Sequence, residues 1–131
     1  MRLWDYRLLE VLPDRFIVSQ WRECIAIKRQ WEKGTLKHRL VSYVMNYDKK
    51  VFREYTRLVI KEMNNRNIKY QEKYFNEIID FCGLSLTTEK YEEHNNRYLK
   101  QCYYNLLEKY RCGGITEEEW EKIEDLFKEE I

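Results

Sequence analysis

Residues that interrupt helices are scarce in this chain, which has one proline and four glycines among 131 residues. No segment alternates apolar and polar residues as a β-strand does, and no hairpin turn signal is present. No apolar run reaches the roughly 18 residues that a membrane-spanning helix needs, and the N-terminus lacks the apolar stretch of a secretory signal. We therefore expect an all-α, cytoplasmic protein that folds as a single compact domain of about five helices over residues 1–131.

Motifs for metals and nucleotides are also missing. The four cysteines are too far apart to form a CxxC pair, which argues against a zinc site and favours reduced thiols. The two histidines, His38 and His94, have no second histidine at metal-ligand spacing, and His94 beside Asn95 and Asn96 is typical of a helix cap or a surface turn. Neither a phosphate-binding glycine loop nor a GxSxG elbow occurs. We expect no metal and no cofactor.

The net charge of +1 hides an uneven distribution. Residues 1–70 contain 16 Lys and Arg against 8 Asp and Glu, whereas residues 71–131 contain 8 against 15. One interpretation is that the basic half binds a polyanion. The other is that the two halves neutralise each other within the fold. A helix-turn-helix DNA reader also remains open, although no specific pattern favours it.

Apolar residues recur at helical spacing in five segments. The predicted helices cover residues 14–31, 49–65, 70–82, 89–111 and a last segment after a capping box formed by Thr116 and Glu119. Pro13 and Asp14 start the first helix, and Asp48 caps the second. The pattern over 89–111 can break at Asn95 and Asn96, and residues 40–47 fit a short helix or an extended piece. The apolar residues among the first twelve are expected to anchor the N-terminus to the core.

The first predicted helix carries a carboxylate on the border between two faces. Its apolar face comprises Phe16, Ile17, Trp21, Cys24 and Ile25. A neighbouring polar stripe comprises Arg15, Ser19, Arg22, Ala26 and Arg29. Glu23 lies between them, where a partly desolvated carboxylate can act as an acid, a base or a charge stabiliser. The alternative is an ordinary solvated glutamate on an amphipathic helix.

Several short matches carry a resemblance to a known family. They are Met1-Arg2-Leu3-Trp4, Trp21-Arg22-Glu23-Cys24, and Tyr47-Asp48-Lys49 leading into a helix that ends with Lys61-Glu62-Met63-Asn64-Asn65-Arg66-Asn67-Ile68. In order and spacing this pattern resembles the pyrimidine-dimer DNA glycosylase family over residues 1–70, and more loosely beyond. The resemblance implies a DNA-repair enzyme whose partner is duplex DNA containing a lesion. The oligomeric state stays open, with a monomer favoured.

The resemblance also implies a chemistry. Members of the family use the N-terminal α-amine as the nucleophile at the sugar C1′, form an imine, and cut the strand by β-elimination. Glu23 matches the essential carboxylate, Arg22 an arginine that engages phosphate, and Arg2 a basic residue beside the nucleophile. Because Arg2 is bulky, we expect Met1 to be retained and its own amine to serve. Ala26 departs from the family, which has another arginine there.

The basic residues of the first half are interpreted as DNA contacts, with a solvated surface as the alternative. The predicted contacts are Arg2, Arg15, Lys28, Arg29, Lys33, Lys37, His38, Arg39, Lys49, Lys50 and Arg53. Two other functions remain open. One is a non-catalytic helical module that binds nucleic acid or protein, and the other is a lyase for abasic sites with little preference for dimers.

Overall fold

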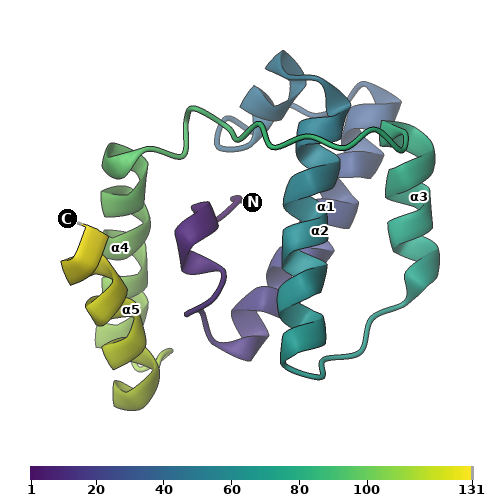
Figure 1. Ribbon diagram of the computed structural model, residues 1–131. Coiled ribbons are helices and arrows are strands. Elements are labelled where there is room, and N and C mark those ends of the chain that lie inside the picture. Colours follow the sequence, from purple (N-terminus) through teal and green to yellow (C-terminus); the bar gives the residue numbers. More distant parts are fainter. Residues whose placement is uncertain (131) are drawn as a thin grey trace.

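Two groups of helices enclose the N-terminal segment in the computed structural model, which describes residues 1–130 (Figure 1). One group contains α1 (Asp14–Lys33), α2 (Lys49–Asn65) and α3 (Glu72–Cys82), and the other contains α4 (Asn96–Arg111) and α5 (Glu117–Glu130). Short 3-10 helices lie at Tyr6–Leu8 (η1) and Ser42–Asn46 (η2), and the described residues form no strand. The prediction of an all-α fold with five main helices is confirmed.

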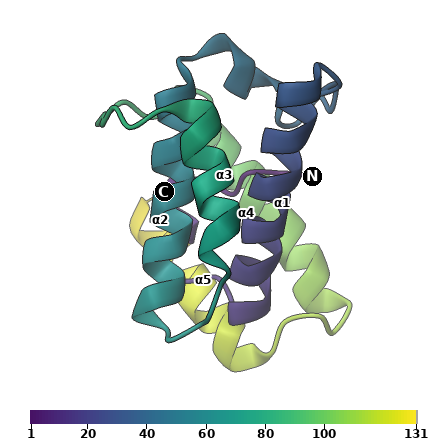
Figure 2. The same ribbon diagram turned by 90° about the vertical axis from the view of Figure 1, so that its right-hand side faces the viewer.

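The three helices of the first group pack against one another, and α3 lies in front of α1 and α2 and between them in Figure 2. On α1 the buried apolar face consists of Ile17, Trp21, Cys24 and Ile27, while Phe16 and Ile25 are half-buried at its edges. None of the helices formed by residues 1–130 combines the length and apolarity that crossing a bilayer requires.

The N-terminal segment is part of the core. Leu3, Trp4, Leu8, Leu9 and Leu12 are all buried, which confirms that this segment anchors the N-terminus. Its backbone is also held from both sides, because the Trp4 carbonyl accepts a hydrogen bond from Tyr55 of α2 and the Leu3 carbonyl accepts one from Tyr98 of α4. Apolar burial, one buried and one part-buried hydrogen bond therefore hold this segment in place.

Helix boundaries follow the capping signals in most places. The Asp48 carboxylate accepts from the Lys50 amide at 2.9 Å, as predicted. The capping box is confirmed in both directions, since the Thr116 amide donates to Glu119 at 2.9 Å and the Glu119 amide to Thr116 Oγ1 at 3.2 Å. Gly83 ends α3 in a backbone conformation with φ of 85°, which favours glycine.

One boundary and one cap differ from the prediction, although α1 starts at Asp14 as predicted. The fourth helix starts at Asn96, at the break that the sequence allowed, and not at residue 89, because the Asn95 side chain accepts from the Tyr98 amide at 3.0 Å and caps the helix there. Pro13 is the N-cap of α1 and makes no side-chain cap bond, and the Asp14 carboxylate pairs with Arg66 at 3.0 Å. Residues 42–46, which the sequence left open, form a 3-10 turn.

A cluster of tyrosines surrounds His94 beneath the N-terminal segment. The Tyr43 hydroxyl lies 2.6 Å from His94 Nε2, and the rings of Tyr6, Tyr55 and Tyr98 lie within about 6 Å of the imidazole. Within residues 1–130 no group is hydrogen-bonded to Nδ1. Burial lowers the pKa of His94 to about 4, because a second proton would place a charge among apolar rings. The predicted helix cap is confirmed at Asn95, and His94 belongs to the turn before it, with its neutral side chain packed among the tyrosines.

This environment predicts a stability that falls with acid. Histidine in an unfolded chain has a pKa near 6.5, so between about pH 6.5 and pH 4 the unfolded state binds a proton that folded His94 does not. The free energy of unfolding then decreases as the pH falls, by about 3 kcal/mol over the whole window. Urea unfolding at pH 7 and pH 4.5 should show that His94→Phe loses less stability than the unsubstituted protein. Equal losses in the two proteins would contradict this assignment.

Candidate active site

Gln20 of α1 connects the N-terminal backbone to the helix. It is fully buried, its Oε1 accepts from the Trp4 amide at 2.7 Å, and its Nε2 donates to the Arg2 carbonyl at 2.8 Å. The same Nε2 lies 3.2 Å from Oε2 of Glu23, one helical turn further along α1. The amide group of Gln20 thus sets where the chain terminus lies relative to Glu23.

Glu23 is half-buried at the border of the two faces of α1, as predicted. Its Oε2 also accepts from the Arg2 backbone amide at 3.3 Å. Among residues 1–130 no cationic group, the terminal amine included, forms an ion pair with Glu23. The carboxylate is therefore oriented by two N–H donors and keeps its remaining accepting capacity for a bound molecule.

Met1 and Glu23 line the same cavity, which has a volume of about 270 Å³. The Met1 nitrogen lies 3.2 Å from Nε2 of His38, and the His38 Nδ1 accepts from the Leu40 amide at 3.3 Å. Because Nδ1 accepts a hydrogen bond, the proton of a neutral imidazole is on Nε2, which can donate to an uncharged amine. His38 was predicted as a DNA contact, and the structure brings it to the amine.

A second cavity has a volume of about 380 Å³. It neighbours the first, because Trp4, Glu23 and Lys109 line both cavities. The second cavity presents the aromatic side chains of Trp4 and Phe16, whose ring centroids are 6.2 Å apart. The two neighbouring cavities are therefore lined by Met1, by Glu23 and by the aromatic residues Trp4 and Phe16.

Sequence reasoning missed three residues that build this site. Gln20 carried a usable signal, because a residue three positions before Glu23 shares its helix face. Asn105 and Lys109 carried none, because α4 reaches the site only through the tertiary fold. Within residues 1–130, no group of three or more His, Cys, Asp or Glu side chains is arranged to hold a metal ion.

The predicted DNA-contacting residues fall into two groups. Most are exposed or half-exposed, namely Arg2, Arg29, Lys33, Lys37, His38, Arg39, Lys49 and Lys50. Lys28 and Arg53 are buried, and their assignment as DNA contacts needs correction. Lys28 pairs with Glu32 at 2.6 Å. The Arg53 guanidinium donates to the Ser85 carbonyl at 2.7 Å and so supports the segment after α3.

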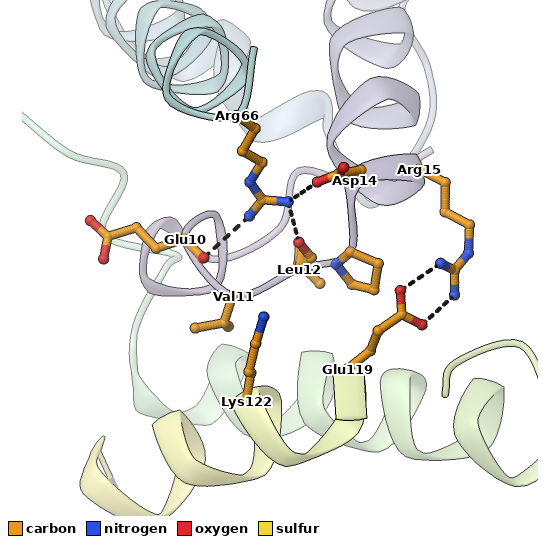
Figure 3. Close-up of a pocket in the computed structure, with 9 residues that line it drawn as sticks. Glu10, Val11, Leu12, Asp14, Arg15, Arg66, Glu119 and Lys122 are labelled. Atoms are coloured by element: carbon orange, nitrogen blue, oxygen red, sulfur yellow. Dashed lines mark hydrogen bonds and ion pairs between the residues drawn. The ribbon is translucent and has the colours of Figure 1, made fainter. Parts of the chain in front are cut away.

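Arg15 is exposed but already engaged. Its guanidinium forms a two-fold pair with Glu119 of α5 and also contacts the Gly114 carbonyl. Figure 3 shows this pair at the edge of a different cavity of about 600 Å³. There Arg66 donates to the Leu12 carbonyl at 2.6 Å and to Asp14. Beside this cavity, Arg66 ties the end of α2 to the N-terminal segment, and Arg15 ties α1 to α5. Both arginines are therefore already engaged.

Other ion pairs join the basic and acidic halves in the same way. Arg7 pairs with Glu130 at 3.4 Å and Arg29 with Glu77 at 3.4 Å, alongside the Arg15 and Glu119 pair. The acidic half therefore neutralises part of the basic half within the fold. The cations between residues 33 and 50 take part in none of these cross-half pairs. Neutralisation within the fold therefore applies to Arg7, Arg15 and Arg29, and binding of a polyanion remains the interpretation for the cations of residues 33–50.

Comparison with known proteins gives one result that covers the site. No curated protein and no solved structure matches the chain. The family described as "Pyrimidine dimer DNA glycosylase" matches residues 1–76, more than half of the sequence. This match spans η1, α1, η2 and α2, and it includes Met1, Gln20, Glu23 and His38. The chain therefore belongs to the pyrimidine dimer DNA glycosylase family.

Proposed function

We propose that this protein removes damaged bases from duplex DNA and cuts the strand at the resulting abasic site, through an imine formed by the Met1 amine. One observation carries the proposal. Met1 and Glu23 line a single cavity, and the Gln20 amide contacts both the Arg2 carbonyl, next to the chain terminus, and the Glu23 carboxylate. Such fixed geometry lowers the entropic part of a reaction barrier.

The proposed reaction begins with attack of the uncharged amine on the sugar C1′. The bond between C1′ and the base breaks, and the base leaves with the electron pair and takes up a proton from water. The nitrogen gives its proton to Glu23, which returns it to O4′ as the ring opens and the imine forms. Removal of a C2′ proton then lets the bond between C3′ and its oxygen break, releasing the phosphate. Glu23 is suited to both proton transfers, because one side of it is open to the cavity.

Phosphate contacts are assigned to cations near this cavity. Arg22 lies exposed on α1 beside Glu23, Lys33 is the last residue of α1, and the connection between α1 and α2 supplies Lys37 and Arg39. Extruding a nucleotide from a duplex costs a few kcal/mol, and phosphate contacts at these residues offset part of that cost. Binding should accordingly weaken steeply with salt.

An assay with three matched duplexes tests the proposal and separates it from its nearest rival. The duplexes carry one pyrimidine dimer, one abasic site or no lesion, and nicking is followed under single-turnover conditions. We expect cleavage of the first two and none of the third. Cleavage of the abasic duplex alone would replace the glycosylase assignment by an abasic-site lyase. No cleavage of either, with binding retained, would favour a non-catalytic nucleic-acid-binding module.

A further inference from the structure

His38 contacts the terminal nitrogen, yet the proposed reaction gives this contact no task. The Met1 nitrogen lies 3.2 Å from His38 Nε2, although the two residues are 37 positions apart in the sequence. Both residues line the cavity that Glu23 also lines. The terminal nitrogen forms no ion pair with a carboxylate of residues 1–130. In the free protein the nucleophile therefore meets an imidazole.

The turn that carries His38 is anchored on both sides. Leu36 and Val41, which flank it, are buried in the core. The His38 carbonyl accepts from the Val41 amide at 3.1 Å, and the Leu40 amide donates to Nδ1 of the ring at 3.3 Å. The backbone and the ring of this exposed residue are therefore held in one orientation toward the Met1 nitrogen.

The fixed ring distinguishes between the two protonation states of the amine. With Nδ1 accepting from the Leu40 amide, a neutral imidazole carries its proton on Nε2 and donates from there. An uncharged amine has a lone pair that accepts this hydrogen bond. An ammonium group has only N–H bonds, and these would face the N–H of His38.

The other charged side chains around this cavity act in both directions. Arg2 and Lys109 disfavour an ammonium group at the chain terminus, whereas Glu23 favours one. His38 adds a hydrogen bond to the uncharged amine, which is the form that attacks carbon.

We propose that His38 is a positioning residue that holds the Met1 amine uncharged and in place until a lesion enters the cavity. The inference rests on the proposed function for the use of that amine, although the contact itself exists in the free protein. When the lone pair turns to C1′, the bond to His38 is released. This release costs little, because a hydrogen bond between two neutral groups is weaker than one to a charged group.

The first test needs no DNA. Trace acetic anhydride labels the α-amine between about pH 6 and pH 9, the range in which α-amines titrate, and mass spectrometry quantifies the N-terminal peptide. In His38→Gln the amide oxygen can accept from an ammonium group, so we expect half-maximal labelling about half a pH unit higher than in the unsubstituted protein. Thr35→Gln is the matched control, because Thr35 is exposed on the same connection and lines neither cavity. Its labelling curve should not move.

A second measurement needs no variant. Nitrogen-15 NMR at neutral pH shows which ring nitrogen carries the proton, and with two histidines in the sequence the assignment is simple. We expect the proton of His38 on Nε2. A proton on Nδ1, or coinciding labelling curves for His38→Gln and the unsubstituted protein, would overturn the inference.

Assays with DNA separate this inference from the proposed function. Borohydride trapping of the imine on an abasic duplex should show the same shift of its acid limb in His38→Gln, with the alkaline rate within a few-fold. Affinity for a duplex carrying a tetrahydrofuran analogue of the abasic site should stay unchanged. A rate lowered equally at every pH, together with weaker binding, would make His38 a DNA contact and contradict the inference. A shifted labelling curve in a protein that cleaves no lesion would contradict the proposed function and leave the contact between His38 and the amine supported.

Discussion

Replacement of Glu23 by glutamine is expected to slow strand cleavage by about 10²–10⁴-fold while lesion binding stays within a few-fold. Glutamine has nearly the same shape, and its Oε1 can still accept from the Arg2 amide and from Gln20. It cannot, however, take up or return a proton or carry the negative charge that stabilises a cationic sugar. Single-turnover nicking of an abasic duplex measures the loss, and binding to the tetrahydrofuran duplex shows whether the surface is intact.

Glu10→Gln is the matched control for this substitution. Glu10 is exposed, and in Figure 3 its carboxylate points away from the neighbouring side chains. The same change of charge at this position should leave cleavage unaffected. Cleavage by Glu23→Gln at the rate of the Glu10→Gln protein would remove Glu23 from the mechanism.

Selective acetylation of the terminal amine is expected to abolish cleavage down to the uncatalysed background. An amide nitrogen has no lone pair available for attack, and the acetyl group also occupies the space beside His38. Modification at low pH favours the α-amine over lysines, because α-amines titrate near 7.7–8.0 and lysine side chains near 10.4. Intact mass and peptide analysis then identify which nitrogen was modified, and nicking assays measure the remaining activity.

A chain extended by two residues before Met1 is a useful companion. It keeps a free amine but moves that nitrogen by up to about 7 Å, out of the position fixed by Gln20. We expect the extended protein to bind the lesion duplex and to cleave it poorly. Undiminished cutting by either the acetylated or the extended protein is incompatible with the proposed nucleophile.

The helices were predictable because their signals are local. The cap at Asp48, the capping box at Thr116 and the end of α3 at Gly83 each depend on residues within a few positions. The predicted pattern began at residue 89 because Tyr91 fits the apolar spacing of the helix, and the Asn95 cap places the start at Asn96. Periodicity alone does not show which of two competing local interactions prevails.

The site was predictable only in part, because its residues come from distant segments. The position of Glu23 followed from the periodicity of one helix, and its role from a resemblance. Arg53 has the spacing of an exposed cation, yet the carbonyl groups of Leu84 and Ser85 cover it. Lys109 has the spacing of an ordinary surface lysine, yet the fold brings it to the cavity beside Glu23. The surroundings of Arg53 and Lys109 are set by residues at least 31 positions away in the sequence, and no local pattern encodes such contacts.

The most direct measurement traps the imine and locates it. Sodium borohydride is added during reaction with an abasic duplex, the covalent adduct is digested with trypsin, and the peptide bearing the sugar remnant is sequenced by mass spectrometry. The account predicts that the remnant is on the α-nitrogen of Met1, within the peptide that ends at Arg2 or Arg7. A remnant on the side chain of Lys109, the lysine that lines the same cavity, would contradict it.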